Sequence, residues 1–136
     1  MTELKRIILI DDDPDDQIFF RDAVHAIFPG LPCETISTCR EALKLLENPP
    51  NPDFIFMDLN MPVMSGFECL AYLKKQPLYR DIPVVIFTTS KNPNDINKTK
   101  ALGAKWYMTK PDDFNVLCKK LHKIIQMEFK EGPYAI

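Results

Sequence analysis

Short apolar runs alternate along the chain with segments in which apolar residues recur every three or four positions. The runs at 54–57 and 84–87 are bounded by polar and turn-forming residues, a pattern that is typical of strands covered on both faces. The intervening segments have the period of amphipathic helices, and the clearest apolar stripe spans 114–125. The predicted strands are 5–10, 34–38, 54–57, 84–87 and 106–109, and the predicted helices begin at Pro14, near Arg40, at Ser65 or Gly66, at Asn92 or Pro93, and at Phe114.

This alternation of five strands with five helices predicts an α/β fold with a doubly wound, five-stranded parallel sheet and helices on both faces. One domain accounts for residues 1–128, and residues 129–136 are predicted to form a C-terminal tail. The predicted helix before Gly103 has only Ile96, Ala101 and Leu102 as apolar anchors, so we expect it to be loosely held.

The composition argues against several classes of protein. The net charge is −2 and 26% of residues are charged, so the chain lacks the basic character of proteins that follow a nucleic-acid backbone. The N-terminus leads into only four apolar residues, which is too short for a signal peptide or a membrane span and predicts a cytoplasmic protein. The cysteines have no C-x-x-C pair and no histidine at zinc-ligand spacing, so we expect reduced thiols in or near the core at Cys33, Cys39, Cys69 and Cys118.

Carboxylates follow two of the predicted strands. Asp58 comes directly after the strand at 54–57, and an acidic cluster that begins with Asp11 and Asp12 follows the first strand. Because parallel strands deliver their carboxyl ends at one edge of a sheet, we expect these three aspartates to lie together, with Thr88 and Lys110 beside them. Three close carboxylates raise one another's pKa unless a cation binds, and an all-oxygen group of this kind suits Mg²⁺.

These residue types point to phosphoryl transfer. A carboxylate can attack phosphorus to form an aspartyl phosphate, and Asp58 is the candidate nucleophile. The transferring phosphoryl group needs a metal ion, an ammonium group and a hydrogen-bond donor around it. Mg²⁺ held by Asp12 and Asp58 would supply the first, and Lys110 and the Thr88 hydroxyl would supply the others.

Four motifs in this order resemble the receiver domain of bacterial two-component response regulators. Thr88 lies thirty residues beyond Asp58, and Lys110 lies twenty-two residues beyond Thr88. The motifs span nearly the whole chain: Ile8-Leu9-Ile10-Asp11-Asp12-Asp13, Met57-Asp58-Leu59-Asn60-Met61-Pro62 followed by Gly66, then Thr88, and Lys110-Pro111. The resemblance implies a flavodoxin-like (βα)5 fold. It also implies a phosphoacceptor signalling protein that catalyses only its own phosphorylation and dephosphorylation, rather than an enzyme with a separate substrate.

The resemblance further implies that a sensor histidine kinase or a histidine phosphotransfer protein phosphorylates Asp58. Mg²⁺ would be bound by Asp12, Asp58 and the backbone carbonyl of Asn60, and Asp11 would contact it through water. Lys110 would pair with the phosphoryl group.

A conformational switch is implied as well. Thr88 would move to hydrogen-bond the phosphoryl group, and Tyr107 would be the aromatic switch residue. The bond between Lys110 and Pro111 resembles one that is cis in the family. Because no effector domain follows, we expect the output to be protein binding, onward phosphoryl transfer, or a homodimer through the fourth helix, the last strand and the last helix.

Two features distinguish this chain within the family that it resembles. Thr89 is larger than the residue that usually follows the switch threonine, and we expect it to slow self-dephosphorylation, with Asn60 and Ser90 flanking the site. In the sequences at 13–16 and 88–90 and in its short tail, the chain is also similar to the stand-alone regulators that partner bacterial phytochromes.

Other functions fit the residues less well. The main alternative is a phosphorylation-independent interaction module with a receiver fold, although such variants usually lack the acceptor, the lysine or an acidic-pocket residue. A flavodoxin-like cofactor binder needs a phosphate-binding loop where this chain has five aspartates and a proline. An aspartyl-phosphate phosphatase would have an acid in place of Asn60, and an EF-hand loop would have a glycine and a terminal glutamate that are missing here. The acidic cluster alone would fit a solvated helix start.

Overall fold

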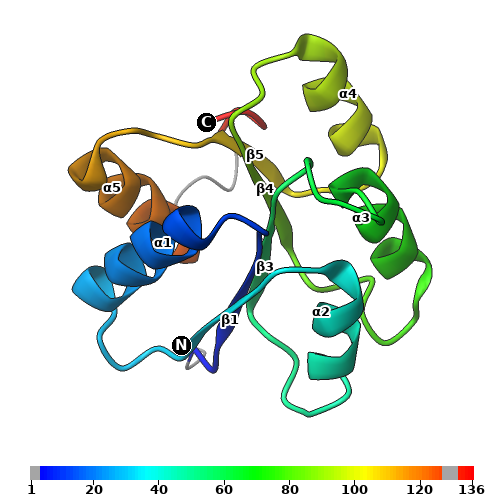
Figure 1. The fold of residues 1–136 in the computed structure, drawn as a ribbon, viewed down its shortest axis with the longest axis horizontal. Coiled ribbons are helices and arrows are strands. Elements are labelled where there is room, and N and C mark those ends of the chain that lie inside the picture. The colour runs from blue at the N-terminus through cyan, green and yellow to red at the C-terminus, as the bar shows by residue number, and fades with distance from the viewer. Residues whose placement is uncertain (1–3, 127–131) are drawn as a thin grey trace.

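The structure is a computed structural model that describes residues 4–126 and 132–136. Within these residues five strands alternate with five helices (Figure 1), and the strands form one sheet in the order β2-β1-β3-β4-β5. Every strand pairing is parallel, so the predicted doubly wound α/β fold is confirmed. The elements are β1 (Ile7–Ile10), α1 (Pro14–Ile27), β2 (Cys33–Ile36), α2 (Cys39–Leu45), β3 (Phe54–Met57), α3 (Gly66–Lys75), β4 (Val84–Thr88), α4 (Pro93–Ala101), β5 (Trp106–Thr109) and α5 (Phe114–Ile125). The predicted boundary between residues 128 and 129 lies outside the described residues.

Helices cover both faces of the sheet, with α1 and α5 on one side and α2, α3 and α4 on the other (Figure 1). Successive side chains of a strand point to opposite faces, so Ile7 and Leu9 pack with α1 and α5 while Ile8 and Ile10 pack with α2 and α3. All four of these side chains are fully buried. Because the central strands are covered on both faces, the polar groups at their ends are held by a rigid core.

Side-chain caps set where the helices begin. The Asp13 carboxylate accepts hydrogen bonds from the backbone N–H groups of Asp15 and Asp16 at the start of α1. Ser65 opens α3 with a reciprocal capping box, in which its hydroxyl accepts from the Glu68 N–H and its own N–H donates to the Glu68 carboxylate. These capped ends lie just beyond the carboxyl ends of β1 and β3, next to the acidic residues.

The helix α4 is thinly anchored, as its sequence predicted. Thr99 is the buried residue of this helix, and Ile96 and the cap residue Leu102 are only half-buried. Ala101 was expected to be a third apolar anchor, but it is exposed, so that part of the prediction is wrong. A helix with so few buried contacts is a candidate for local opening.

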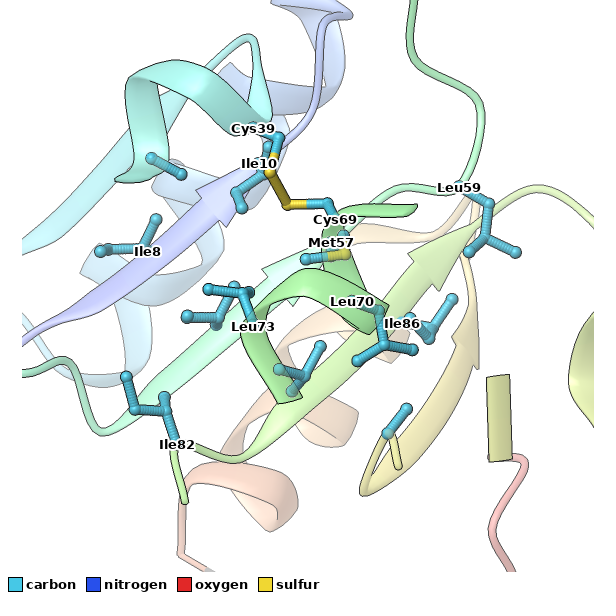
Figure 2. Packing of buried hydrophobic residues seen from close by; sticks show 14 of the residues in the cluster. Ile8, Ile10, Cys39, Met57, Leu59, Cys69, Leu70, Leu73, Ile82 and Ile86 are labelled. Atoms are coloured by element: carbon cyan, nitrogen blue, oxygen red, sulfur yellow. A yellow bond between two sulfur atoms is a disulfide. The ribbon is translucent and has the colours of Figure 1, made fainter. Parts of the chain in front are cut away.

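The expectation of reduced thiols is wrong for two cysteines. Cys39 at the start of α2 and Cys69 in α3 form a disulfide, with their Cα atoms 5.9 Å apart (Figure 2). Both lie within the apolar core on the same side of the sheet. Cys33 and Cys118 are free and half-buried, and burial raises the pKa of Cys33 to about 12, which keeps that thiol protonated.

Among the described helices, none combines the length and the apolar character that a membrane crossing requires.

Candidate functional site

The acidic residues that follow β1 and β3 meet at one edge of the sheet. One carboxylate oxygen each from Asp11, Asp12 and Asp58 lies within 4.8 Å of the others. Asp11 is fully buried and Asp58 is 6% exposed, whereas Asp12 is open to solvent. The sequence prediction that these three aspartates would lie together is confirmed, because the parallel register brings the ends of neighbouring strands side by side.

Lys110, just after β5, places its ammonium group among the carboxylates. Its Nζ lies 2.8 Å from Asp11 Oδ2, 3.0 Å from Asp58 Oδ2 and 2.7 Å from Asp16 Oδ2. Burial alone would lower the pKa of Lys110, but the three carboxylates together raise it above its usual range. The ammonium group therefore stays charged and reaches from β5 to the ends of β1 and β3.

Asp16 also belongs to this site, although in the sequence it was only one member of the acidic cluster that follows the first strand. It lies in the first turn of α1, and its backbone N–H donates to the Asp13 cap. The position of a carboxylate several residues after the first strand does not by itself predict that it will contact Lys110. Only the turn geometry brings it back to Lys110.

The Asp11 carboxylate has capacity for a cation. Its Oδ1 accepts a hydrogen bond from the Asp13 N–H at 3.0 Å. Its buried Oδ2 lies 2.8 Å from the Lys110 ammonium and accepts no well-directed hydrogen bond among the described residues. Burial raises the pKa of Asp11 more than its hydrogen bonds lower it, so a cation on this oxygen would relieve the cost of its charge. Three oxygen donors at this spacing fit a hard divalent ion.

The loop after β3 holds the Asp58 carboxylate in place. Asp58 Oδ1 accepts hydrogen bonds from the N–H groups of Leu59 at 2.7 Å and of Asn60 at 3.4 Å. The loop then turns back so that the Gly66 N–H donates to the Leu59 carbonyl at 3.0 Å. A Cβ atom on Gly66 would lie 2.2 Å from the Asp58 carbonyl oxygen, so only glycine permits this approach. The sequence motif included Gly66 but did not reveal that role.

Thr88 and Tyr107 are buried beside the site and are linked through Ser90. The Ser90 N–H approaches Thr88 Oγ1 at 3.4 Å, and the Tyr107 hydroxyl donates to the Ser90 carbonyl at 2.8 Å. The Lys110 N–H also donates to the Thr88 carbonyl at 2.7 Å. Within the described part of the chain, no hydrogen bond joins the Thr88 and Asp58 side chains. The structure thus brings Thr88 to the correct edge of the sheet but not into contact with the carboxylate.

The remaining predicted residues surround this edge. Thr89 and Asn60 are exposed, and Ser90 is half-buried with its hydroxyl donating to Asp95 at 2.6 Å. The expectation of a cis bond before Pro111 is wrong, because the cis peptide bond of the described residues is Pro49–Pro50. The family resemblance, rather than any local pattern, had suggested that bond.

Comparison with known protein families identifies the family of this chain. The response regulator receiver domain matches residues 7–122 of the chain. This chain is a member of the receiver domain family. Receiver domains are phosphoacceptor signalling modules of two-component systems, and the cluster of Asp11, Asp12 and Asp58 is their typical acidic pocket.

Individual relatives include phytochrome response regulators. The chain is 40% identical over 80 residues to response regulator Rcp1 of Synechocystis sp., a match that covers 59% of this chain and 52% of Rcp1. It resembles the structure of the phosphorylated cyanobacterial phytochrome response regulator RcpA with a TM-score of 0.81 and 31% identity, covering 93% of this chain and 94% of RcpA. The Mn²⁺-bound form of Rcp1 gives a TM-score of 0.79 with 28% identity, covering 96% and 98% of the two chains. The chain spans about half the length, or less, of the first curated relatives that it matches.

Proposed function

We propose that this chain is the receiver of a response regulator, that it accepts a phosphoryl group on Asp58, and that it passes the signal on by protein binding or onward phosphoryl transfer. The observation that carries the proposal is the position of the Asp58 carboxylate, between the acidic cluster and the Lys110 ammonium at 3.0 Å. The donor would be a histidine kinase or a histidine phosphotransfer protein, because the family is that of two-component signalling.

The roles of the site residues follow from the charge that phosphoryl transfer develops. An oxygen of Asp58 attacks phosphorus while the bond from phosphorus to the donor nitrogen breaks, so the phosphoryl group moves and the donor histidine leaves. Asp12, Asp58 and the Asn60 carbonyl would hold Mg²⁺, with Asp11 contacting it through water, and the ion would supply positive charge to the phosphoryl oxygens. Lys110 stays beside the new phosphate as a second positive group.

Thr88 and Tyr107 form the proposed switch. A phosphoryl group on Asp58 offers new acceptor oxygens. The Thr88 hydroxyl accepts from the Ser90 N–H at 3.4 Å and donates to no acceptor among the described residues, so it can donate to one of these oxygens. Movement of Thr88 reaches Tyr107 through Ser90, whose carbonyl accepts from the Tyr107 hydroxyl. The thin anchorage of α4 makes the face formed by α4, β5 and α5 the element that responds.

The proposed partners follow from this surface and from the relatives. A downstream protein or a second copy of the chain would bind the face of α4, β5 and α5, and no nucleic acid or membrane is expected as a partner. The likeness to Rcp1 and to RcpA supports a phytochrome-type kinase as the upstream partner. We expect phosphoryl transfer from the kinase to this chain to take place in the cytoplasm.

The proposal is tested by incubation with acetyl phosphate and Mg²⁺, followed by intact-mass measurement. We expect the wild-type chain to gain one phosphoryl group only when Mg²⁺ is present, and we expect Asp58→Asn to gain none. Asp81→Asn is the matched control, because Asp81 is an exposed aspartate that precedes β4 at the opposite edge of the sheet. Equal labelling of Asp58→Asn and of the wild type would contradict the assignment of the acceptor. No labelling by acetyl phosphate or by a phosphorylated histidine donor would favour a phosphorylation-independent interaction module.

Thr89 is proposed to tune the lifetime of the phosphate. Its side chain is exposed and directly follows Thr88 at the end of β4. We expect Thr89→Ala to shorten the lifetime of the phosphorylated form by about fivefold, which corresponds to roughly 1 kcal/mol in the barrier. The decay of the phosphorylated mass after removal of acetyl phosphate measures this lifetime. A lifetime equal to that of the wild type would remove Thr89 from the tuning residues.

A further inference from the structure

The C-terminal segment, residues 132–136, lies along the edge of β5 (Figure 1). The Tyr107 N–H donates to the Tyr134 carbonyl at 2.9 Å, and the Ile136 N–H donates to the Tyr107 carbonyl at 2.8 Å. These bonds form a parallel bridge between Tyr107 and Ala135. An edge strand normally offers its unpaired N–H and carbonyl groups to another chain. Here the end of the same chain pairs with them.

Two side chains anchor the segment, one toward α4 and one toward α5. The Tyr134 ring centroid lies 6.3 Å from that of Tyr107, and the Tyr134 hydroxyl lies 2.7 Å from Thr99 Oγ1 in α4. Burial raises the pKa of Tyr134 to about 12. Ile136 packs against the apolar cluster on the α5 side of the sheet. The segment therefore bridges the two helices that flank β5.

The segment contacts the residues on which the proposed switch depends. Tyr107 is fully buried, and its backbone is paired with the segment while its hydroxyl is bonded to Ser90. A Tyr107 ring that turned out of the core would have to displace the Tyr134 ring packed against it. Thr99, the buried residue of α4, is the hydrogen-bond partner of Tyr134. Undocking of the segment would therefore also remove a contact that anchors α4.

We propose that residues 132–136 are an intramolecular clamp that occupies the β5 edge and keeps Tyr107 in its buried position. While the clamp is docked, the β5 edge and the adjoining side of α4 are covered, so a partner that pairs with β5 as an extended strand must first displace it. The tether favours the clamp over a free peptide, since it keeps the segment at a high effective concentration. The regulatory meaning of this clamp rests on the proposed function, but the docking itself does not.

Amide hydrogen exchange measured by NMR on the unphosphorylated full chain tests the clamp. We expect Tyr134→Ala to accelerate exchange at the Tyr107 and Ile136 amides by about tenfold or more, because their bridge loses a half-buried anchor. The Lys105 amide, which donates to the Val84 carbonyl on the other side of β5, should keep its rate. Tyr72→Ala is the matched control, because Tyr72 is 44% exposed on α3. Tyr134→Phe, which keeps the ring and loses only the bond to Thr99, should give a smaller acceleration of the same two amides.

Three results would overturn the clamp. One is a Tyr107 amide that exchanges at the wild-type rate in Tyr134→Ala. Another is an acceleration in Tyr134→Phe and Tyr134→Ala that is equal at Lys105 and Tyr107, which would mean global destabilisation instead. The third is wild-type protection that rises with protein concentration, which would mean that the segment pairs with a second copy. None of these readouts uses phosphate, so failure of phosphorylation on Asp58 would leave the test intact.

Discussion

Replacement of Lys110 by methionine should lower the free energy of unfolding by about 3–5 kcal/mol in metal-free buffer, the usual loss when one partner of a buried ion pair is removed. The reason is that the Lys110 ammonium forms ion pairs with Asp11 and Asp58, which are both buried, as well as with the half-buried Asp16. Methionine fills much of the same volume but leaves those carboxylates facing one another. Urea unfolding in the presence of EDTA measures the loss.

Mg²⁺ should return part of that stability. Because the ammonium group no longer occupies the same oxygens, we expect the free energy gained on adding Mg²⁺ to be larger in Lys110→Met than in the wild type. Lys91→Met is the matched control, because Lys91 is an exposed lysine in the loop before α4. Equal losses in the two variants would mean that the ion pairs of Lys110 contribute nothing to the fold. A smaller gain from Mg²⁺ in Lys110→Met than in the wild type would argue against shared oxygens.

The fold and the main cluster of the site could be predicted because both follow from local patterns. A four-residue apolar run such as Phe54–Met57 has few ways to be buried other than as a central strand. Once the strands are parallel, the residue after each strand must emerge at the same edge. Asp11 and Asp58 therefore needed no information from outside their own segments.

The features that escaped prediction depend on contacts between distant segments. Cys39 and Cys69 are separated by 30 positions and meet only because α2 and α3 cover the same face of the sheet. Tyr134 lies in what the sequence indicated was only a tail, yet it is the partner of Thr99. Ala101 has the right residue type for an anchor, but the helical rotation turns it toward solvent. Residue type and spacing along the chain do not predict these contacts.

Gly66→Ala should lower the free energy of unfolding by an amount similar to that lost in Lys110→Met. Here the cause is a steric clash instead of the loss of a charge. The added Cβ would lie 2.2 Å from the Asp58 carbonyl oxygen and 2.7 Å from the Leu59 Cα atom. Both contacts are to backbone, so no side chain can rotate away and the loop itself must move. We expect the free energy of unfolding to fall by about 3 kcal/mol, at the upper end of what overpacking costs. Thermal or urea unfolding of the variant measures it.

The same displacement should impair the site even in the folded variant. The Asp58 carboxylate is held by the N–H groups of Leu59 and Asn60, so a loop that shifts to admit the Cβ also shifts the carboxylate relative to Lys110. Phosphorylation by acetyl phosphate should therefore slow at temperatures where the variant is fully folded. Gly30→Ala separates this effect from the general effect of adding a methyl group, because a Cβ at Gly30 meets nothing within 4 Å. That control should change stability by less than about 1 kcal/mol, and in the stabilising direction, since alanine restricts the unfolded chain. If Gly66→Ala matched Gly30→Ala in both stability and labelling rate, the close approach of the loop to Asp58 would have no part in positioning the acceptor.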